Sequence, residues 1–263
     1  MRVGNMFVYG LVLALAAPAA AFGGVEDVKT PRGETVRLLV EPGDNPFATV
    51  VLFAGGHGVV DISASGQIGK LGGNFLVASR HHFQKAGAIT VVIDAPTDRR
   101  NNLHNFRQSQ NHADDVAAVV KHLRDKYKRP VWLIGTSRGT ESVANAGARL
   151  TGDDKPAGIV LTSSITLPHR HNPTHVLDSE LDKIVVPVLI AHHRQDACEF
   201  CPPGNVEVMR AALKNANPVK VLWYEGGEGM KGDPCEPFHH HGFVGIRSKV
   251  VNDIMGWIKT PSG

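Results

Sequence analysis

The chain has 263 residues, of which 42% are hydrophobic and 20% are charged, and its formal net charge is +3. This length fits one large α/β domain with a sizeable core, and the composition is ordinary for a globular protein. The small, scattered charge argues against nucleic acid or an anionic membrane surface as a partner, so we expect neither.

The N-terminus has the features of a targeting segment. Arg2 provides a positive charge, residues 6–17 are apolar apart from Gly10, and residues 19–21 are alanines. We therefore predict a signal peptide over residues 1–21 and a single mature domain over residues 22–263. We expect that domain to be secreted or periplasmic and free of the membrane after cleavage. An uncleaved anchor is the alternative, although the apolar stretch is short for a membrane span.

Apolar runs alternate with helix-like runs along the rest of the chain. This alternation predicts an α/β fold with a mostly parallel sheet flanked by helices. The predicted strands cover residues 35–40 (as an edge strand), 48–54, 89–93, 131–134, 158–162, 186–192 and 219–224. The predicted helices cover residues 74–86, 111–127, 140–150, 203–216 and 245–259.

The most informative motif is Gly135-Thr136-Ser137-Arg138-Gly139, directly after the apolar run at residues 131–134. A buried strand that ends in Gly-x-Ser-x-Gly and enters a helix makes a tight turn that lifts the serine hydroxyl over the sheet edge. Glycine is needed in such a turn because backbone segments approach too closely for a Cβ atom. The motif favours Ser137 as a nucleophile, and an ordinary Gly/Ser turn is the alternative.

With this motif and its context, the chain resembles the α/β-hydrolase superfamily from about residue 30 onward. The compact branches without a cap domain, the dienelactone-hydrolase-like proteins and small esterases, are the most similar. The resemblance implies a serine hydrolase that acts on a small-molecule acyl substrate without metal or organic cofactor. Only about 23 residues separate the strands at 158–162 and 186–192, enough for a helix or two near residues 174–183 but not for a lid domain. We therefore expect an open active site.

The superfamily places its catalytic residues in the chain order serine, acid, histidine. Asp196 follows the strand at 186–192, and the resemblance assigns it the acid role; a solvated loop carboxylate is the alternative. Asp94 also ends a strand but precedes the serine, so it is more easily explained as a loop-shaping residue.

Three adjacent histidines lie between the last strand and the last helix, where the family places its base. The resemblance favours His241 because it is followed by Gly242 and Phe243 just before the helix. His240 and then His239 remain alternatives for the base.

Two backbone N–H groups should bind the oxyanion. The resemblance assigns one to Arg138, the residue after the nucleophile. The other should come from the loop Gly55-Gly56-His57-Gly58, with Gly56 as first choice and His57 as second. The Arg138 side chain could bind a substrate carboxylate or phosphate, but a structural pairing with an acidic residue is favoured. His57, Arg107 and Arg99-Arg100 could line the pocket mouth.

The chain has three cysteines: Cys198, Cys201 and Cys235. A Cys198–Cys235 disulfide would join the loop of the predicted acid to the loop of the predicted base, and we favour it over Cys201–Cys235 and Cys198–Cys201. A zinc site with His192, His193 or His239 is conceivable, but the spacing matches no standard zinc pattern, so we predict no metal site.

These residues and the resemblance predict an exported serine hydrolase that cleaves an ester or related acyl bond through an acyl-enzyme intermediate, with Ser137, Asp196 and His241 as its triad. A peptidase or amidase on the same triad is the alternative within the fold. A non-catalytic binding protein with a relic triad is the alternative from another class, and a histidine-rich metal-binding protein is a fourth, although its histidines are dispersed.

Overall fold

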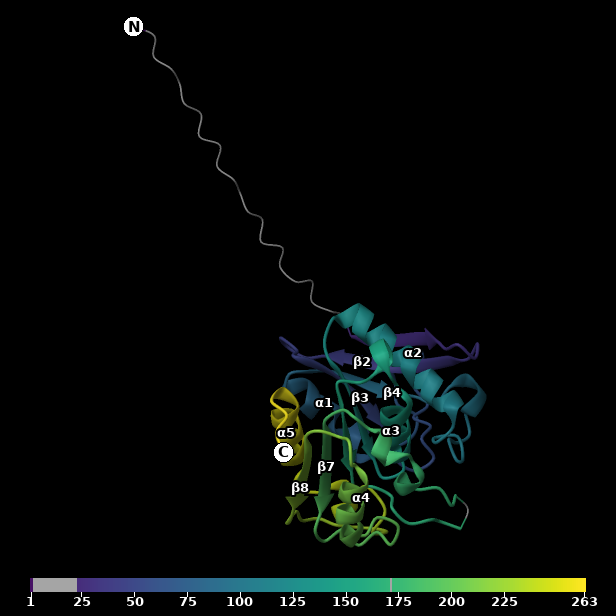
Figure 1. Ribbon diagram of the computed structural model, residues 1–263, viewed down its shortest axis with the longest axis vertical. Helices are drawn as coiled ribbons and strands as arrows, with labels where there is room; N and C mark the ends of the chain where they lie inside the picture. The colour runs from purple at the N-terminus through teal and green to yellow at the C-terminus, as the bar shows by residue number, and fades with distance from the viewer. Residues whose placement is uncertain (2–22, 171) are drawn as a thin grey trace.

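The computed structural model describes residue 1, residues 23–170 and residues 172–263 (Figure 1). The predicted signal peptide lies outside the described residues except for Met1. Within the described part of the chain, no helix is both long enough and apolar enough to span a membrane.

One eight-stranded sheet forms the centre of the molecule, in the order β1-β2-β4-β3-β5-β6-β7-β8 (Figure 1). Strands β3 to β8 run parallel to one another, whereas β2 is antiparallel to both of its neighbours, β1 and β4. The strands are β1 (Gly24–Lys29), β2 (Thr35–Pro42), β3 (Ala48–Phe53), β4 (Ala88–Ile93), β5 (Val131–Thr136), β6 (Gly158–Thr162), β7 (Val188–His193) and β8 (Val219–Tyr224).

The strand predicted as an edge is not the edge. β2 lies between β1 and β4, and β1 is the outer strand that the sequence did not reveal. In β1 only Val28 is fully buried, so this strand lacks the apolar run that marks the central strands. The central strands β3, β4 and β5 are buried at every position, as expected for a parallel sheet covered on both faces.

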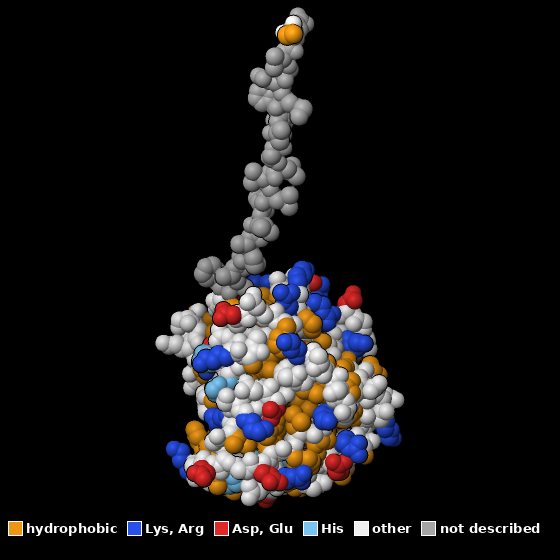
Figure 2. All heavy atoms as spheres, turned by 90° about the vertical axis from the view of Figure 1, so that its left-hand side faces the viewer, with side chains coloured by type: hydrophobic (Ala, Val, Ile, Leu, Met, Phe, Trp, Pro, Cys, Tyr) orange, Lys and Arg blue, Asp and Glu red, His pale blue; other side chains and the backbone are white. Residues whose placement is uncertain are grey.

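Helices cover both faces of the sheet. One apolar core contains side chains of α2, α3 and α4, and the core on the other face contains side chains of α1 and α5. The helices are α1 (Phe75–Lys85), α2 (Gln110–Tyr127), α3 (Gly139–Arg149), α4 (Val206–Ala212) and α5 (Arg247–Lys259). On the face in Figure 2, charged side chains of both signs are spread among apolar and uncharged ones.

Two predicted helices are shorter than expected. The segment predicted as a helix at 203–216 begins as a 3-10 turn, Pro203–Asn205, and α4 ends at Ala212. Glycine and proline at its start and the Asn217-Pro218 pair beyond its end disfavour a longer helix. The segment near 174–183 forms two 3-10 helices, Val176–Asp178 and Leu181–Lys183, instead of an α-helix.

Candidate active site

Ser137 occupies a sharp turn between β5 and α3. Its φ angle is +52°, in the left-handed region that most residues avoid. Its backbone N–H donates to the Thr162 carbonyl at 3.0 Å, which ties the turn to the neighbouring strand. At Gly139 a Cβ atom would lie 2.1 Å from the Phe53 carbonyl oxygen, so only glycine fits there. The turn therefore has the geometry of a nucleophile elbow, and it leaves Ser137 half-buried at the sheet edge.

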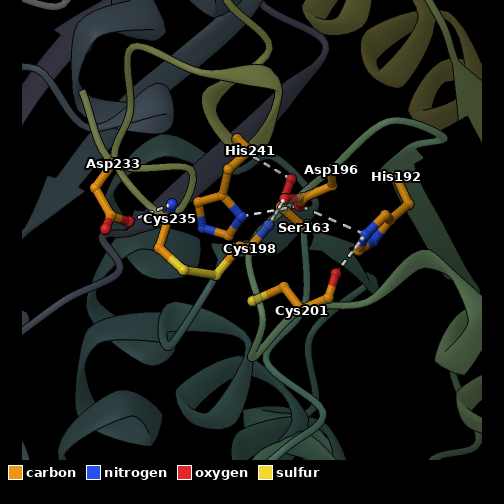
Figure 3. Close-up of a disulfide and its surroundings, with 8 residues drawn as sticks. All are labelled: Ser163, His192, Asp196, Cys198, Cys201, Asp233, Cys235 and His241. Carbon is orange, nitrogen blue, oxygen red and sulfur yellow. Dashed lines mark hydrogen bonds and ion pairs between the residues drawn. A yellow bond between two sulfur atoms is a disulfide. The ribbon is translucent and has the colours of Figure 1, made fainter. Parts of the chain in front are cut away.

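Asp196 and His241 meet across 45 residues of sequence. His241 Nδ1 lies 2.9 Å from Asp196 Oδ2, and both side chains are buried (Figure 3). The other oxygen of Asp196 accepts the backbone N–H of Cys198 at 3.0 Å. The Ser163 hydroxyl donates to the His241 carbonyl at 2.9 Å, which holds the base from its backbone. A carboxylate bound at Nδ1 fixes the imidazole tautomer and leaves Nε2 able to accept a proton.

The neighbouring histidines make different contacts. His240 Nδ1 lies 3.1 Å from the Gln195 carbonyl, and its ring stacks on His193. Nδ1 of His239 is buried and has no hydrogen-bond partner among the described residues. His192 Nε2 lies 3.0 Å from the Cys201 carbonyl and 3.5 Å from Asp196. Burial lowers the pKa of His192 to about 4, so it is neutral near pH 7. Of the three predicted candidates for the base, His241 is the one held by a carboxylate.

Ser137 and His241 line one cleft, but no hydrogen bond joins their side chains among the described residues. Ser137 and the buried Cys201 also line a second cleft together. Catalytic hydrogen bonds are often long or misaligned in structures without substrate and shorten when the substrate binds. The structure thus brings the three predicted residues to one site, without a hydrogen bond between the serine and the histidine side chains in the described residues.

The loop after β3 lies against the elbow. A Cβ atom at Gly55 would lie 2.9 Å from the Ser137 Cβ atom, so this loop and the nucleophile are in close contact. No hydrogen bond of the described residues uses the backbone N–H of Gly56, His57 or Arg138. The three N–H groups thus have no backbone partner among the described residues, and their role in binding an oxyanion stays a prediction.

Arg107 was predicted at the pocket mouth, but it is fully buried beneath the loop after β3. Its guanidinium donates to the Ala54 carbonyl at 3.0 Å, the Gly56 carbonyl at 3.4 Å and the Ser142 hydroxyl on α3 at 2.9 Å. Burial lowers the pKa of Arg107 to about 10, which still leaves it charged near pH 7. Because a trans peptide points its N–H away from its C=O, these bonds turn the N–H groups of Gly55 and His57 away from the interior.

No protein-family model matches the chain, and no curated protein matches its sequence. Solved structures do match. The chain is similar to an esterase of Pyrococcus furiosus, with a TM-score of 0.64 and 14% identity over 96% of each chain. It is also similar to an α/β serine hydrolase without a lid from Xanthomonas campestris, with a TM-score of 0.57 and 12% identity over 93% of this chain and 98% of that one.

The chain has the α/β-hydrolase fold. A third similar structure is a puromycin-hydrolysing peptidase from Mycobacterium tuberculosis, with a TM-score of 0.59 and 17% identity over 92% of this chain and 40% of that chain. The predicted fold class is confirmed, including its compact form: between β6 and β7 the described residues form only short 3-10 helices.

Two clefts of this α/β-hydrolase fold meet at Ser137. The first has a volume of about 400 Å³, and its lining includes His241 and the apolar side chains of Leu71, Phe75 and Phe238. The second has a volume of about 370 Å³, and its lining includes His57, His104, Arg138 and Cys201. A substrate with two substituents on its reacting carbon could thus place one on each side of the nucleophile.

His57 belongs to both clefts. Its Nδ1 accepts the backbone N–H of Val59 at 3.1 Å, so the ring proton is on Nε2 and this nitrogen is a donor. Burial and, to a lesser degree, the nearby Lys70 and Arg107 charges lower the pKa of His57, which favours the neutral ring.

Arg138 and Asp94 both have structural partners. Arg138 donates to Glu141 at 3.1 Å and to two backbone carbonyls, at 3.1 and 3.3 Å, which supports the favoured structural role of its side chain. Asp94 accepts four backbone N–H groups, from Val60, Asp61, Ile62 and Ala95, so it shapes the loop after β3 instead of a catalytic centre. Arg100 pairs with Asp94 at 3.3 Å.

The predicted Cys198–Cys235 disulfide is confirmed, and Cys201 is a buried free thiol (Figure 3). The bridge joins the segment after Asp196 to the segment before His241, the two loops that carry the acid and the base. The position of Cys201 beside Ser137 was not predicted, since nothing in a Cys-x-x-Cys spacing shows which thiol will face the nucleophile.

Proposed function

We propose that this chain is an exported serine hydrolase that cleaves an ester or related acyl bond through an acyl-enzyme intermediate. The observation that carries the proposal is the 2.9 Å contact between His241 and Asp196 in the cleft that Ser137 lines, with Ser137 on a nucleophile elbow. The similar structures include esterases and serine hydrolases, and they support this class.

In the proposed mechanism, the side chain of Ser137 turns toward His241 when substrate binds. Its hydroxyl attacks the acyl carbonyl while Nε2 of His241 takes its proton, and Asp196 stabilises the imidazolium that forms. The N–H groups of Arg138 and of Gly56 or His57 bind the oxyanion. His241 then gives its proton to the departing alcohol, and water releases the acyl group by the same route in reverse.

Two observations support export. The disulfide is of the kind that persists in oxidising compartments, and residues 1–21 have the pattern of a signal peptide. Sequencing the N-terminus of the protein recovered from outside the cytoplasm tests this part, and a start near Phe22 is the expected result.

A fluorophosphonate probe and p-nitrophenyl esters of increasing acyl length test the activity. Wild-type protein should be labelled once, and Ser137→Ala should lose the label and reduce kcat by about 10⁴-fold or more. Ser65→Ala, at an exposed serine, is the matched control and should behave like wild type. A wild-type protein that reacts with neither the probe nor any ester would favour the non-catalytic alternative.

A panel of aminoacyl amides beside the esters tests the peptidase alternative, which the similarity to the mycobacterial peptidase keeps open. Faster turnover of amides than of matched esters would move the proposal to an amidase with the same triad. Faster turnover of the esters supports the proposal as stated.

A further inference from the structure

Three side chains at the site form a compact donor cluster, of which the proposed hydrolysis uses only His241. One ring nitrogen of His241 and the sulfur atoms of Cys198 and Cys201 all lie within 4.8 Å of one another, and all three residues are buried. The sulfur of Cys235 is bonded to that of Cys198 and therefore lies at the edge of this cluster (Figure 3).

While the disulfide is intact, two of these sulfurs cannot bind a metal as thiolates. When it is reduced, the donor set becomes Cys198, Cys201, Cys235 and His241. A Cys₃His set is one of the standard tetrahedral zinc sites, and the two-residue spacing between Cys198 and Cys201 is typical of zinc ligands. Cys235 is half-buried and lines both clefts, so a small reductant and a metal ion can reach the cluster.

A zinc-bound histidine usually donates its other ring N–H to a carboxylate or carbonyl, and the site provides such an acceptor. His241 Nδ1 faces Asp196 at 2.9 Å, which places the proton on Nδ1 and leaves the lone pair of Nε2 for a metal. This carboxylate–histidine arrangement fixes ring orientation and raises ligand basicity in zinc proteins. The contact that makes His241 a base thus makes it a preformed zinc ligand.

We propose that reduction of the Cys198–Cys235 disulfide turns this centre into a zinc site, with Cys198, Cys201, Cys235 and Nε2 of His241 as its four ligands. The reductant is a phosphine or a dithiol. It supplies two electrons to the disulfide, which takes up two protons and becomes two thiols; the phosphine becomes its oxide with oxygen from water, and a dithiol becomes a cyclic disulfide. Zn²⁺ then displaces the three thiol protons.

The bound metal also stops the proposed reaction, and this part of the inference rests on the proposed function. A metal on Nε2 occupies the lone pair that would accept the Ser137 proton. The oxidised protein is therefore the active form, and the reduced protein is active only until zinc binds.

Cobalt spectroscopy tests the metal site without relying on activity. Reduced wild-type protein, treated with a phosphine that does not bind metals strongly, is titrated with Co²⁺ under anaerobic conditions. The expected result is one tetrahedral Co²⁺ per chain, seen as intense visible d–d bands and a thiolate charge-transfer band, both of which disappear when Zn²⁺ is added. Oxidised wild type should show neither band.

Cys201→Ser is the matched variant, because it removes one ligand and leaves both disulfide cysteines in place. Reduced Cys201→Ser should bind Co²⁺ with an affinity lowered by at least about 10-fold and with altered bands. Reduced wild type without tetrahedral bands, or an unchanged spectrum in Cys201→Ser, would overturn the inference. So would a reduced chain that loses its native circular dichroism and does not recover it with metal. Zinc inhibition of ester hydrolysis is measured separately, so a protein that binds cobalt but hydrolyses nothing contradicts only the proposed function.

Discussion

Removing the disulfide should cost this protein several kcal/mol of stability. The bridge closes a loop with a sequence separation of 37 residues. In the chain-entropy model, a loop of that size restricts the denatured ensemble by about 4 kcal/mol at 25 °C. We therefore expect the double variant Cys198→Ala/Cys235→Ala to lose about 4 kcal/mol of unfolding free energy, which corresponds to a decrease in Tm of about 8–15 °C for a domain of this size.

Urea unfolding followed by circular dichroism measures this change. Cys201→Ala is the control, since it removes a buried sulfur of the same cluster but keeps the bridge. The m-value of the double variant should rise slightly, because its denatured chain is less compact. The double variant should also lose more in kcat than in KM, since the loops of Asp196 and His241 are no longer joined. A loss of less than about 1 kcal/mol would refute the entropic reasoning.

Two further predictions concern buried groups away from the disulfide. Arg107→Met should lower kcat by about 10²-fold with little change in KM, because the carbonyls of Ala54 and Gly56 lose the group that orients their peptides. Arg107→Lys should recover part of this loss. Binding of a trifluoromethyl ketone inhibitor to Arg107→Met should weaken in parallel with kcat, and an inhibition constant that stays at its wild-type value would contradict this role. Burial lowers the pKa of His112 to about 3. Between about pH 6.5 and 3 the unfolded chain therefore binds a proton that the folded protein does not. In this range the unfolding free energy should decrease by up to about 1.4 kcal/mol for each unit by which the pH falls. His112→Phe should flatten this slope in urea unfolding between pH 7 and 4.5, and an unchanged slope would show that other groups cause it.

The central strands were predictable because of where they lie. Strands β3, β4, β5, β6 and β7 are buried at every position and therefore form short continuous apolar runs in the sequence. β1 was not predictable from such runs, since it is an outer strand with a mostly polar sequence. Its pairing with β2, from Gly24 with Val40 to Lys29 with Thr35, depends on tertiary contacts that no local pattern shows.

Within the site, the sequence specified the order of residues better than their contacts. The motif around Ser137 and the order serine, acid, histidine pointed to three residues that lie at one site. The choice among three adjacent histidines came from family resemblance alone. The structure adds a physical difference between two of them: Asp196 contacts His241, whereas His240 contacts a backbone carbonyl. The position of Arg107 was wrong in the sequence analysis because arginines are seldom fully buried, and its partners Ala54 and Gly56 are about fifty residues away.

The position of His241 depends on one disulfide and a few hydrogen bonds more than on packing of the loop that precedes it. Residues 225–239 contain neither helix nor strand, and many of them are exposed. The disulfide at Cys235 fixes one end of this loop to the loop of Asp196. At the other end, Ser163 holds the His241 carbonyl, and Arg247 of α5 donates to the carbonyls of Gly242 and Pro237. Because the hydrogen bonds of Ser163 and Arg247 come from separate elements, losing one of them should loosen the imidazole without unfolding the sheet, so variants of these two residues should affect catalysis more than stability.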